Sequence, residues 1–188
     1  MNHSVAALIP AAGLSGRMGI PKALLRHGCG SSFARYMLNC YGIFGCDPVV
    51  LVINHQLSDT EITSGKHLTI LNPNPQWGRT HSIRLGLKAI PPATPCFVHN
   101  VDNPYLTPEM LDAMLALVTP KDYVVPVFKG KGGHPVLLGA TVADAIRDCA
   151  EPSDFRSLLS SWPRKEVGWN DDRILLNINT PDDYRQMI

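Results

Sequence analysis

The sequence predicts an α/β protein in which a mostly parallel, mixed central sheet lies between two layers of helices. Short apolar runs rich in β-branched residues alternate with longer amphipathic stretches, which is the pattern of β–α–β units. The first run, residues 5–9, leads directly into a segment of small residues. Hydrophobic residues make up 45% of the 188 positions, too many for a disordered chain. We therefore expect one three-layer domain that spans residues 1–188.

The strands and helices follow the apolar periodicity along the chain. Strands are predicted near 4–9, 48–53, 67–71, 95–99, 122–127, 134–138 and 173–178. Helices are predicted near 32–44, 79–89, 108–118, 141–149, 154–161 and 181–187. Two of these helices have clear starts, because Thr107 and Thr180 each precede a proline and an early carboxylate.

Charge and cysteine content argue against several classes of function. A formal net charge of +1 gives no long-range attraction to nucleic acid or to an anionic membrane. No stretch approaches the ~20 apolar residues of a membrane span, and the start of the chain lacks the pattern of a signal peptide. The five cysteines form no C-x-x-C pair and indicate neither a disulfide framework nor a zinc site. We expect a cytoplasmic protein without nucleic-acid or membrane partners, which binds any anionic ligand through local groups.

The segment PAAGLSGRMGIPK, residues 10–22, follows the first predicted strand. Ligands of parallel α/β sheets bind beyond the carboxyl ends of the strands, and small residues allow backbone N–H groups to face an anion. Pro21 stands where a Walker loop needs its second glycine, and the spacing G-x-G-x-x-G is not formed. The segment is either a plain glycine-rich turn or a phosphate loop of another kind. Arg17 and Lys22 favour the phosphate loop, because both provide the charge that phosphates need.

Three later positions are candidates for chemistry. Asp102, in CFVHNVDNP (96–104), follows a predicted strand, and its carboxylate is free to hold Mg²⁺ because Thr107 already supplies the helix cap. Ser82, in GRTHSIRLGL (78–87), either lies near a ligand or caps its helix. His134, in KGGHPV (131–136), either lines a site or is an ordinary core or turn histidine.

Taken together, these motifs resemble those of the MobA-like nucleotidyltransferases, which include molybdenum cofactor cytidylyltransferases and guanylyltransferases. Residues 10–22 resemble the family signature L-A-A-G-x-S-x-R-M-G-x-x-K, and 78–87 resemble G-x-x-x-S-x-x-x-G-L. The resemblance implies a Rossmann-like nucleotidyltransferase fold of the GT-A type. It also implies Mg²⁺-dependent transfer of a nucleoside monophosphate, CMP from CTP, to a phosphorylated acceptor such as molybdopterin, with release of pyrophosphate. Transient docking to a molybdoenzyme or its chaperone would follow.

The resemblance also gives each candidate residue an expected role. Three residues are expected to be catalytic: Arg17 on the departing pyrophosphate, Lys22 at the α-phosphate and Asp102 on Mg²⁺. The positions expected to bind the nucleotide are Ala11, Ala12, Gly13, Ser15, Gly16, Asn54 and Ser82. His134 and Arg156 are expected on the acceptor side.

The sequence departs from the cytidylyl pattern in two places. DFRSLL (154–159), around Arg156, lacks the glycines of G-D-x-G-x-R-x-L-L. Asn177 and Asn179 replace the two leading aspartates of D-I-D-T-P-E-D-L. Because N-x-N-T-P-E-E occurs in the guanylyl branch, Asn177 is expected to offer the metal a neutral oxygen. Asn54 also matches a guanylyl position, whereas AAG (11–13) and GHP (133–135) favour CTP, so the base is cytosine or guanine.

Several alternatives therefore stay open. The protein could be a nucleotidyltransferase for sugar or alditol phosphates, a guanylyltransferase that uses GTP, or a regulatory protein that keeps a nucleotide pocket without turnover. A dinucleotide-dependent oxidoreductase would share the fold class, but the missing G-x-G-x-x-G argues against it.

Overall fold

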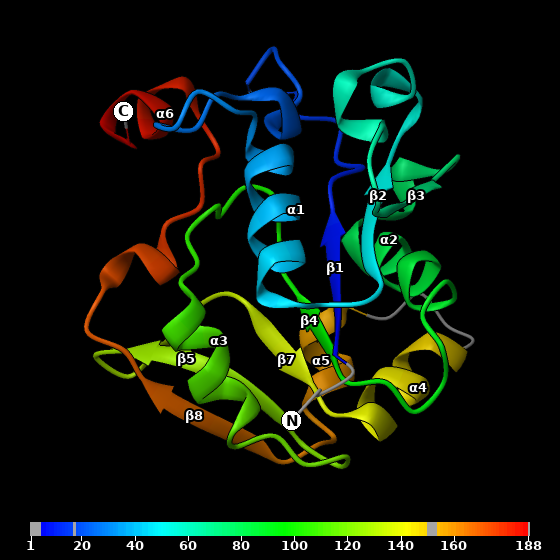
Figure 1. The fold of residues 1–188 in the computed structure, drawn as a ribbon, viewed down its shortest axis with the longest axis vertical. Coiled ribbons are helices and arrows are strands. Elements are labelled where there is room, and N and C mark those ends of the chain that lie inside the picture. Colours follow the sequence, from blue (N-terminus) through cyan, green and yellow to red (C-terminus); the bar gives the residue numbers. More distant parts are fainter. Residues whose placement is uncertain (1–4, 17, 150–153, 188) are drawn as a thin grey trace.

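Figure 1 shows the computed structural model, which describes residues 5–16, 18–149 and 154–187. Its eight-stranded sheet has the order β3-β2-β1-β4-β7-β5-β6, and β8 pairs with β5. The strands are β1 (Ala6–Pro10), β2 (Val49–Ile53), β3 (Leu68–Leu71), β4 (Cys96–Val98), β5 (Tyr123–Phe128), β6 (Lys131–Gly132), β7 (Val136–Leu138) and β8 (Arg164–Gly168). The pairs β1–β2, β1–β4, β2–β3 and β5–β8 are parallel, whereas β6 and β7 run antiparallel to their neighbours. The predicted mixed, mostly parallel sheet is confirmed.

Helices cover both faces of the sheet (Figure 1). They are α1 (Phe33–Phe44), α2 (Arg79–Leu87), α3 (Pro108–Leu115), α4 (Ala140–Asp148), α5 (Phe155–Leu159) and α6 (Pro181–Met187). On one face, α1 and α3 pack in a cluster that includes Ile9 and Leu51. On the other face, α2, α4 and α5 pack in a cluster that includes Leu8 and Val52. Neighbouring residues of one strand thus enter opposite cores, as expected for strands buried on both sides.

One predicted strand is wrong, and two observed strands, the two-residue β6 and β8, were not predicted. Asp172–Leu175, which overlaps the predicted strand at 173–178, forms a short 3₁₀ helix, because the Asp171 side chain caps it by accepting from the Arg173 N–H at 3.0 Å. The last strand is instead β8, in which Val167 is buried among partly or fully exposed residues. A strand that pairs along one side with β5 can carry charged residues, so its apolar pattern is weak.

Helix α2 approaches β1 closely. A Cβ atom built on Gly86 would lie 2.2 Å from Leu8 Cδ1 and 2.9 Å from Val52 Cγ2. Glycine therefore permits this packing. The approach holds the first turn of α2 beside the carboxyl ends of β1 and β2. None of the described helices is long and apolar enough to cross a membrane.

The chain is capped where it enters α3 and α6. Thr107 Oγ1 accepts a hydrogen bond from the Met110 N–H at 3.3 Å, as its position before Pro108 predicts. Before α6, the Asp183 N–H donates to Thr180 Oγ1 at 3.2 Å, and Asp183 Oδ2 accepts from the N–H groups of Asn179 (2.9 Å) and Thr180 (2.8 Å). This reciprocal cap fixes the backbone at Asn179.

Candidate active site

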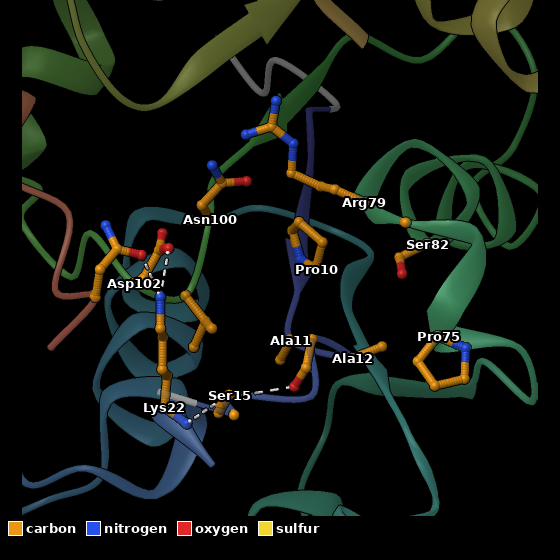
Figure 2. A pocket seen from close by; sticks show the side chains of 15 residues that line it. Pro10, Ala11, Ala12, Ser15, Lys22, Pro75, Arg79, Ser82, Asn100 and Asp102 are labelled. Atoms are coloured by element: carbon orange, nitrogen blue, oxygen red, sulfur yellow. Dashed lines mark hydrogen bonds and ion pairs between the residues drawn. The ribbon is translucent and has the colours of Figure 1, made fainter. Parts of the chain in front are cut away.

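A cavity of about 330 Å³ opens at the carboxyl ends of β1 and β4, next to the start of α2 (Figure 2). Most of its lining comes from the segment after β1, the segment after β4 and the start of α2. Pro75 and Asn179 complete it. The lining residues are Pro10, Ala11, Ala12, Gly13, Ser15, Gly16, Lys22, Pro75, Gly78, Arg79, Ser82, Asn100, Val101, Asp102 and Asn179. The structure therefore brings together most of the residues expected at the nucleotide. Arg17, which was expected on the pyrophosphate, lies outside the described residues.

Hydrogen bonds to β2 and to Asn54 hold the loop after β1 in place. The Ala11 N–H donates to the Val52 carbonyl at 2.8 Å. Asn54 is 2% exposed; its Nδ2 donates to the Ala12 carbonyl at 3.0 Å and its Oδ1 accepts from the Gln56 N–H at 2.9 Å. Asn54 was expected to contact the nucleotide, but it is not among the residues that line the cavity. Its contacts show that it positions the loop.

Ser15 turns the loop back toward Lys22. Its φ of +50° is uncommon for a residue other than glycine, so the surrounding contacts must hold this backbone conformation. The Met18 N–H donates to the Ser15 carbonyl at 2.9 Å, and the Lys22 N–H donates to Ser15 Oγ at 3.1 Å. Together, these bonds place Lys22 at the edge of the cavity.

Gly13 and Gly16 face open space. A Cβ atom built on either one would meet nothing within 4 Å, and neither residue has a φ in the left-handed region. Packing and backbone conformation therefore do not require glycine at these positions. Both residues line the cavity, where a missing side chain lets a bound group approach the backbone N–H groups.

Lys22 bridges two segments at the other side of the cavity. Its Nζ donates to Asp102 Oδ2 at 3.0 Å and to Asn179 Oδ1 at 2.7 Å. Figure 2 shows the Lys22 side chain extending toward Asp102. Asn179 Nδ2 donates to the Asn177 carbonyl at 3.2 Å, and the Asn177 side chain is exposed. Asn177 was expected to hold the metal, but it does not line the cavity, whereas Asn179 does and contacts Lys22. The reason is that residues 176–179 lie between a 3₁₀ helix and the cap of α6 and do not form the predicted strand.

Ser82 is held by a buried neighbour. Its side chain is 4% exposed, and its Oγ accepts from Asn72 Nδ2 at 2.9 Å. Asn72 Oδ1 in turn accepts from the Asn74 N–H at 2.8 Å. Ser82 therefore lines the cavity in a fixed orientation. Sequence reasoning missed Asn72, although its position directly after β3 matches the rule that drew attention to Asp102.

A second cavity of about 290 Å³ adjoins the first, because Arg79 and Asn100 line both. The predicted acceptor residues His134 and Arg156 line this second cavity. His134 Nε2 lies 3.3 Å from Asn100 Nδ2. Figure 2 shows the Arg79 side chain reaching from the start of α2 toward Asn100. Sequence reasoning did not single out Arg79, although an arginine directly after Gly78 stood at the start of a predicted helix.

His134 is neutral at physiological pH. Burial lowers its pKa to about 4; the Asp102 carboxylate partly opposes this shift, and the positive charge of Arg79 adds to it. Its ring stacks on that of His99, with centroids 6.2 Å apart. His99 Nδ1 lies 2.9 Å from the hydroxyl of Tyr41, and burial lowers the pKa of His99 as well. The two uncharged rings therefore separate the second cavity from the core.

Residues 7–167 match the model of the MobA-like NTP transferase domain. The chain belongs to this family. The molybdenum cofactor cytidylyltransferase of Escherichia coli is 25% identical over 184 residues, which cover 96% of this chain and 94% of the relative. A nucleotidyl transferase from Methanothermobacter thermautotroptrophicus has a TM-score of 0.82 at 18% identity, covering 98% of this chain and 95% of that one. The complex of Rv0371C with manganese from Mycobacterium tuberculosis H37Rv has a TM-score of 0.79 at 20% identity, covering 98% and 97%. These structures confirm the predicted Rossmann-like nucleotidyltransferase fold.

The cavity of this MobA-like NTP transferase fits a hard divalent cation. Asp102 and Asn179 both direct oxygen atoms at one point, where the Lys22 ammonium already lies. Asp102 Oδ1 is buried and has no hydrogen-bond partner among the described residues. Carboxylate and amide oxygens are suitable ligands for Mg²⁺ or Mn²⁺. The described part of the chain holds no cluster of three or more His, Cys, Asp or Glu that could bind a metal, so the other ligands would be phosphate oxygens and water.

Proposed function

We propose that this protein transfers CMP from CTP to the phosphate of a small-molecule acceptor, molybdopterin or a close analogue, and releases pyrophosphate. The observation that carries the proposal is the pair of adjoining cavities. Lys22 and Asp102 line the first cavity, His134 lines the second, and Arg79 and Asn100 line both. A nucleotide in one cavity and an acceptor in the other would meet at the shared residues.

The proposed reaction is a displacement at phosphorus. An oxygen of the acceptor phosphate forms a bond to the α-phosphorus of CTP. The bond from that phosphorus to the oxygen bridging to the β-phosphate breaks, and pyrophosphate leaves with the bonding electrons. Because a phosphate already carries an anionic oxygen at neutral pH, no general base is needed, which agrees with the lowered pKa of His134. Catalysis then rests on positioning and on neutralising charge.

Each part of the first cavity has a role in this scheme. Backbone N–H groups of residues 12–16 would bind the β- and γ-phosphates, and Lys22 would neutralise charge at the α-phosphate. Arg17 is proposed to contact the departing pyrophosphate. Asp102 and Asn179 would hold Mg²⁺, which supplies charge neutralisation to phosphate oxygens when bound. Assigning Asn179 instead of Asn177 rests on the contact between Asn179 Oδ1 and Lys22 Nζ.

The preference for CTP rests on the similarity to the E. coli cytidylyltransferase and on the segments AAG and GHP. Asn54, the position that matched the guanylyl branch, has both ends of its amide engaged with Ala12 and Gln56. Asn54 is also 2% exposed and does not line the cavity, so its match gives little support to GTP. The family resemblance is also the basis for proposing a cytoplasmic location and transient docking to a molybdoenzyme or its chaperone.

The test is a panel of nucleoside triphosphates and acceptors read by pyrophosphate release. CTP, GTP, ATP and UTP are each combined with molybdopterin, a sugar 1-phosphate or an alditol phosphate in the presence of Mg²⁺. We expect the highest kcat/KM with CTP and molybdopterin. Equal or faster release with GTP, or with a sugar or alditol phosphate, would support those alternatives. Nucleotide binding without any release of pyrophosphate would support the regulatory protein.

A further inference from the structure

The second cavity concentrates positive charge that transfer to a single phosphate does not require. Arg79, Arg156 and Arg164 all line it, and the described lining contains no aspartate or glutamate. The formal net charge of the whole chain is only +1, so this excess is local. A single arginine can already bind a phosphate through two parallel hydrogen bonds.

The three arginines differ in which cavities they line. Arg79 lines both cavities, whereas Arg156 and Arg164 line only the second. Arg79 Cζ lies 5.8 Å from the centroid of the Phe155 ring, and its guanidinium has no hydrogen bond or ion pair within the described residues. Arg79 is thus placed at the end where the nucleotide and the acceptor would meet, with its donors free.

The Arg164 side chain of β8 reaches Gly132 of β6, away from the first cavity, which neither residue lines. A Cβ atom on Gly132 would lie 2.8 Å from Arg164 Nη2, so the guanidinium of Arg164 lies against β6 where glycine leaves room. Its partner Glu166 lies 2.9 Å away, but both side chains are exposed, by 38% and 53%, and such surface pairs are weak. Glu166 does not line the cavity. The donors of Arg164 can therefore bind a ligand as well.

The remaining lining is mostly apolar. It consists of Val98, Asn100, Tyr123, Val125, Gly132, Gly133, His134, Val136, Phe155 and Leu159. A sugar or alditol body presents many hydroxyl groups, and each one that is buried without a partner costs free energy. Asn100, Tyr123 and His134 supply few neutral partners for such a body. The valine, leucine and phenylalanine side chains instead suit an apolar or planar body.

We propose that the acceptor carries a second anionic group at the end opposite its attacking phosphate. Arg79 binds the attacking phosphate, and Arg156 and Arg164 bind the second anion. The acceptor class is therefore a phosphate monoester with a largely apolar or planar body and a distal anion. Phosphates of sugars and alditols that lack a second anionic group bind poorly. This assignment deepens the proposed function and rests on it, because it takes the second cavity as the acceptor site.

The test is calorimetric titration of the full chain with two matched probes, phenyl phosphate and 4-carboxyphenyl phosphate. We expect the probe with two anionic groups to bind about tenfold more tightly, as a charge-assisted contact typically provides. Arg164→Gln combined with Arg156→Gln should remove this preference while phenyl phosphate binds as before. Arg79→Gln should weaken both probes by the same factor. Arg185→Gln, at an exposed arginine of α6 that lines neither cavity, is the control and should keep the preference.

Equal binding of the two probes, or a preference that survives the double variant, overturns the proposal. All the substituted arginines are exposed, so thermal unfolding should match the parent and exclude misfolding as the cause. The titration needs neither nucleotide nor turnover, which separates the two proposals. Pyrophosphate release could be as efficient with sugar phosphates that lack a second anionic group as with phosphate esters that carry one. This result would overturn the proposed second anion but not the proposed nucleotidyl transfer. If the double variant loses the preference for 4-carboxyphenyl phosphate and the parent releases no pyrophosphate with any acceptor, nucleotidyl transfer is overturned and the anion site is supported.

Discussion

Lys22 Nζ lies 3.0 Å from Asp102 Oδ2, and the two side chains are 16% and 23% exposed. Asn179 Oδ1 accepts from the same ammonium at 2.7 Å. Partial burial strengthens this contact relative to a surface ion pair. One positive charge therefore occupies the point at which the two oxygen ligands of the candidate metal site converge. The Lys22 ammonium should therefore affect both catalysis and metal binding.

Lys22→Ala should lower the rate of pyrophosphate release by about 10²-fold or more, because it removes a positive charge aimed at the reacting phosphate. The fold should survive, since the lysine side chain lies at the edge of a cavity and not in either core cluster. The measurement is kcat with CTP and the best acceptor, together with circular dichroism. Lys121→Ala, at an exposed lysine that lines neither cavity, is the matched control. Unchanged turnover in Lys22→Ala would remove the loop from the catalytic machinery.

Lys22→Met should increase the affinity of the nucleotide-free protein for Mn²⁺ by about tenfold. In the parent, a divalent cation must displace the ammonium from Asp102 and Asn179, and methionine removes this competition at similar side-chain length. The measurement is free Mn²⁺ by electron paramagnetic resonance, which does not depend on turnover.

Asp102→Ala is the companion variant, because it removes the carboxylate and should weaken Mn²⁺ binding in both backgrounds. If Lys22→Met binds Mn²⁺ no more tightly than the parent, the ammonium does not compete with the cation at this point.

Asn179→Asp should lower the half-saturating Mg²⁺ concentration for turnover, because it adds a negative charge next to Asp102 without changing side-chain size. Asn177→Asp should leave it unchanged, since the Asn177 side chain is exposed and does not line the cavity. The two variants differ in position but not in chemistry, which makes each the control for the other. A larger effect at 177 would show that the segment before α6 rearranges when the metal binds.

The sequence indicated that the loop after β1 and Asp102 lie at one site, because both follow apolar strand runs whose ends must meet at one edge of a parallel sheet. It did not distinguish Asn177 from Asn179, because a strand was predicted where the chain forms a 3₁₀ helix. The local cap at Thr180 was visible in the sequence, but the bond from Asn179 to Lys22, 157 positions away in the chain, was not. Contacts at such separation depend on how the elements pack, which local patterns do not determine.

The role of Asn54 shows the same limit. A motif match placed it at the base, and the structure places it beneath the Ala12 carbonyl. Strand β8 was missed for a different reason. It pairs on one side with β5 and buries Val167 among charged neighbours, so its residues lack the apolar run that identified the other strands.

Acidification should destabilise the protein through His134. Its pKa of about 4 in the folded state lies below the ordinary 6.5, so the unfolded chain binds a proton more readily. The neutral form therefore contributes stability above pH 6.5, and this contribution is lost as the pH falls through 6.5 toward 4. His134→Gln should flatten part of the decline in thermal unfolding temperature over that range. His99 titrates in the same direction and should leave a residual slope. An unaltered pH profile in His134→Gln would show that this histidine is not buried neutral.

Gly13→Ala and Gly86→Ala should differ in their effect on stability, although the chemical change is the same. At Gly86, the added Cβ would lie 2.2 Å from Leu8 Cδ1, so we expect a loss of about 1–3 kcal/mol in the free energy of unfolding. At Gly13, the Cβ would meet no protein atom within 4 Å, and stability should stay within about 0.5 kcal/mol of the parent or rise slightly.

The affinity for CTP should show the reverse order, with the larger effect at Gly13. The methyl group at Gly13 would lie where the phosphates of CTP approach the backbone N–H groups, so the Kd for CTP should rise by about tenfold. Gly86→Ala should bind CTP with the parent's affinity at a temperature where it is fully folded. Calorimetric titration and urea unfolding of both variants measure the two effects separately. If Gly13→Ala bound CTP like the parent, the open space beside Gly13 would not be where the phosphates lie, and the anion-binding loop would have to be sought elsewhere in the cavity.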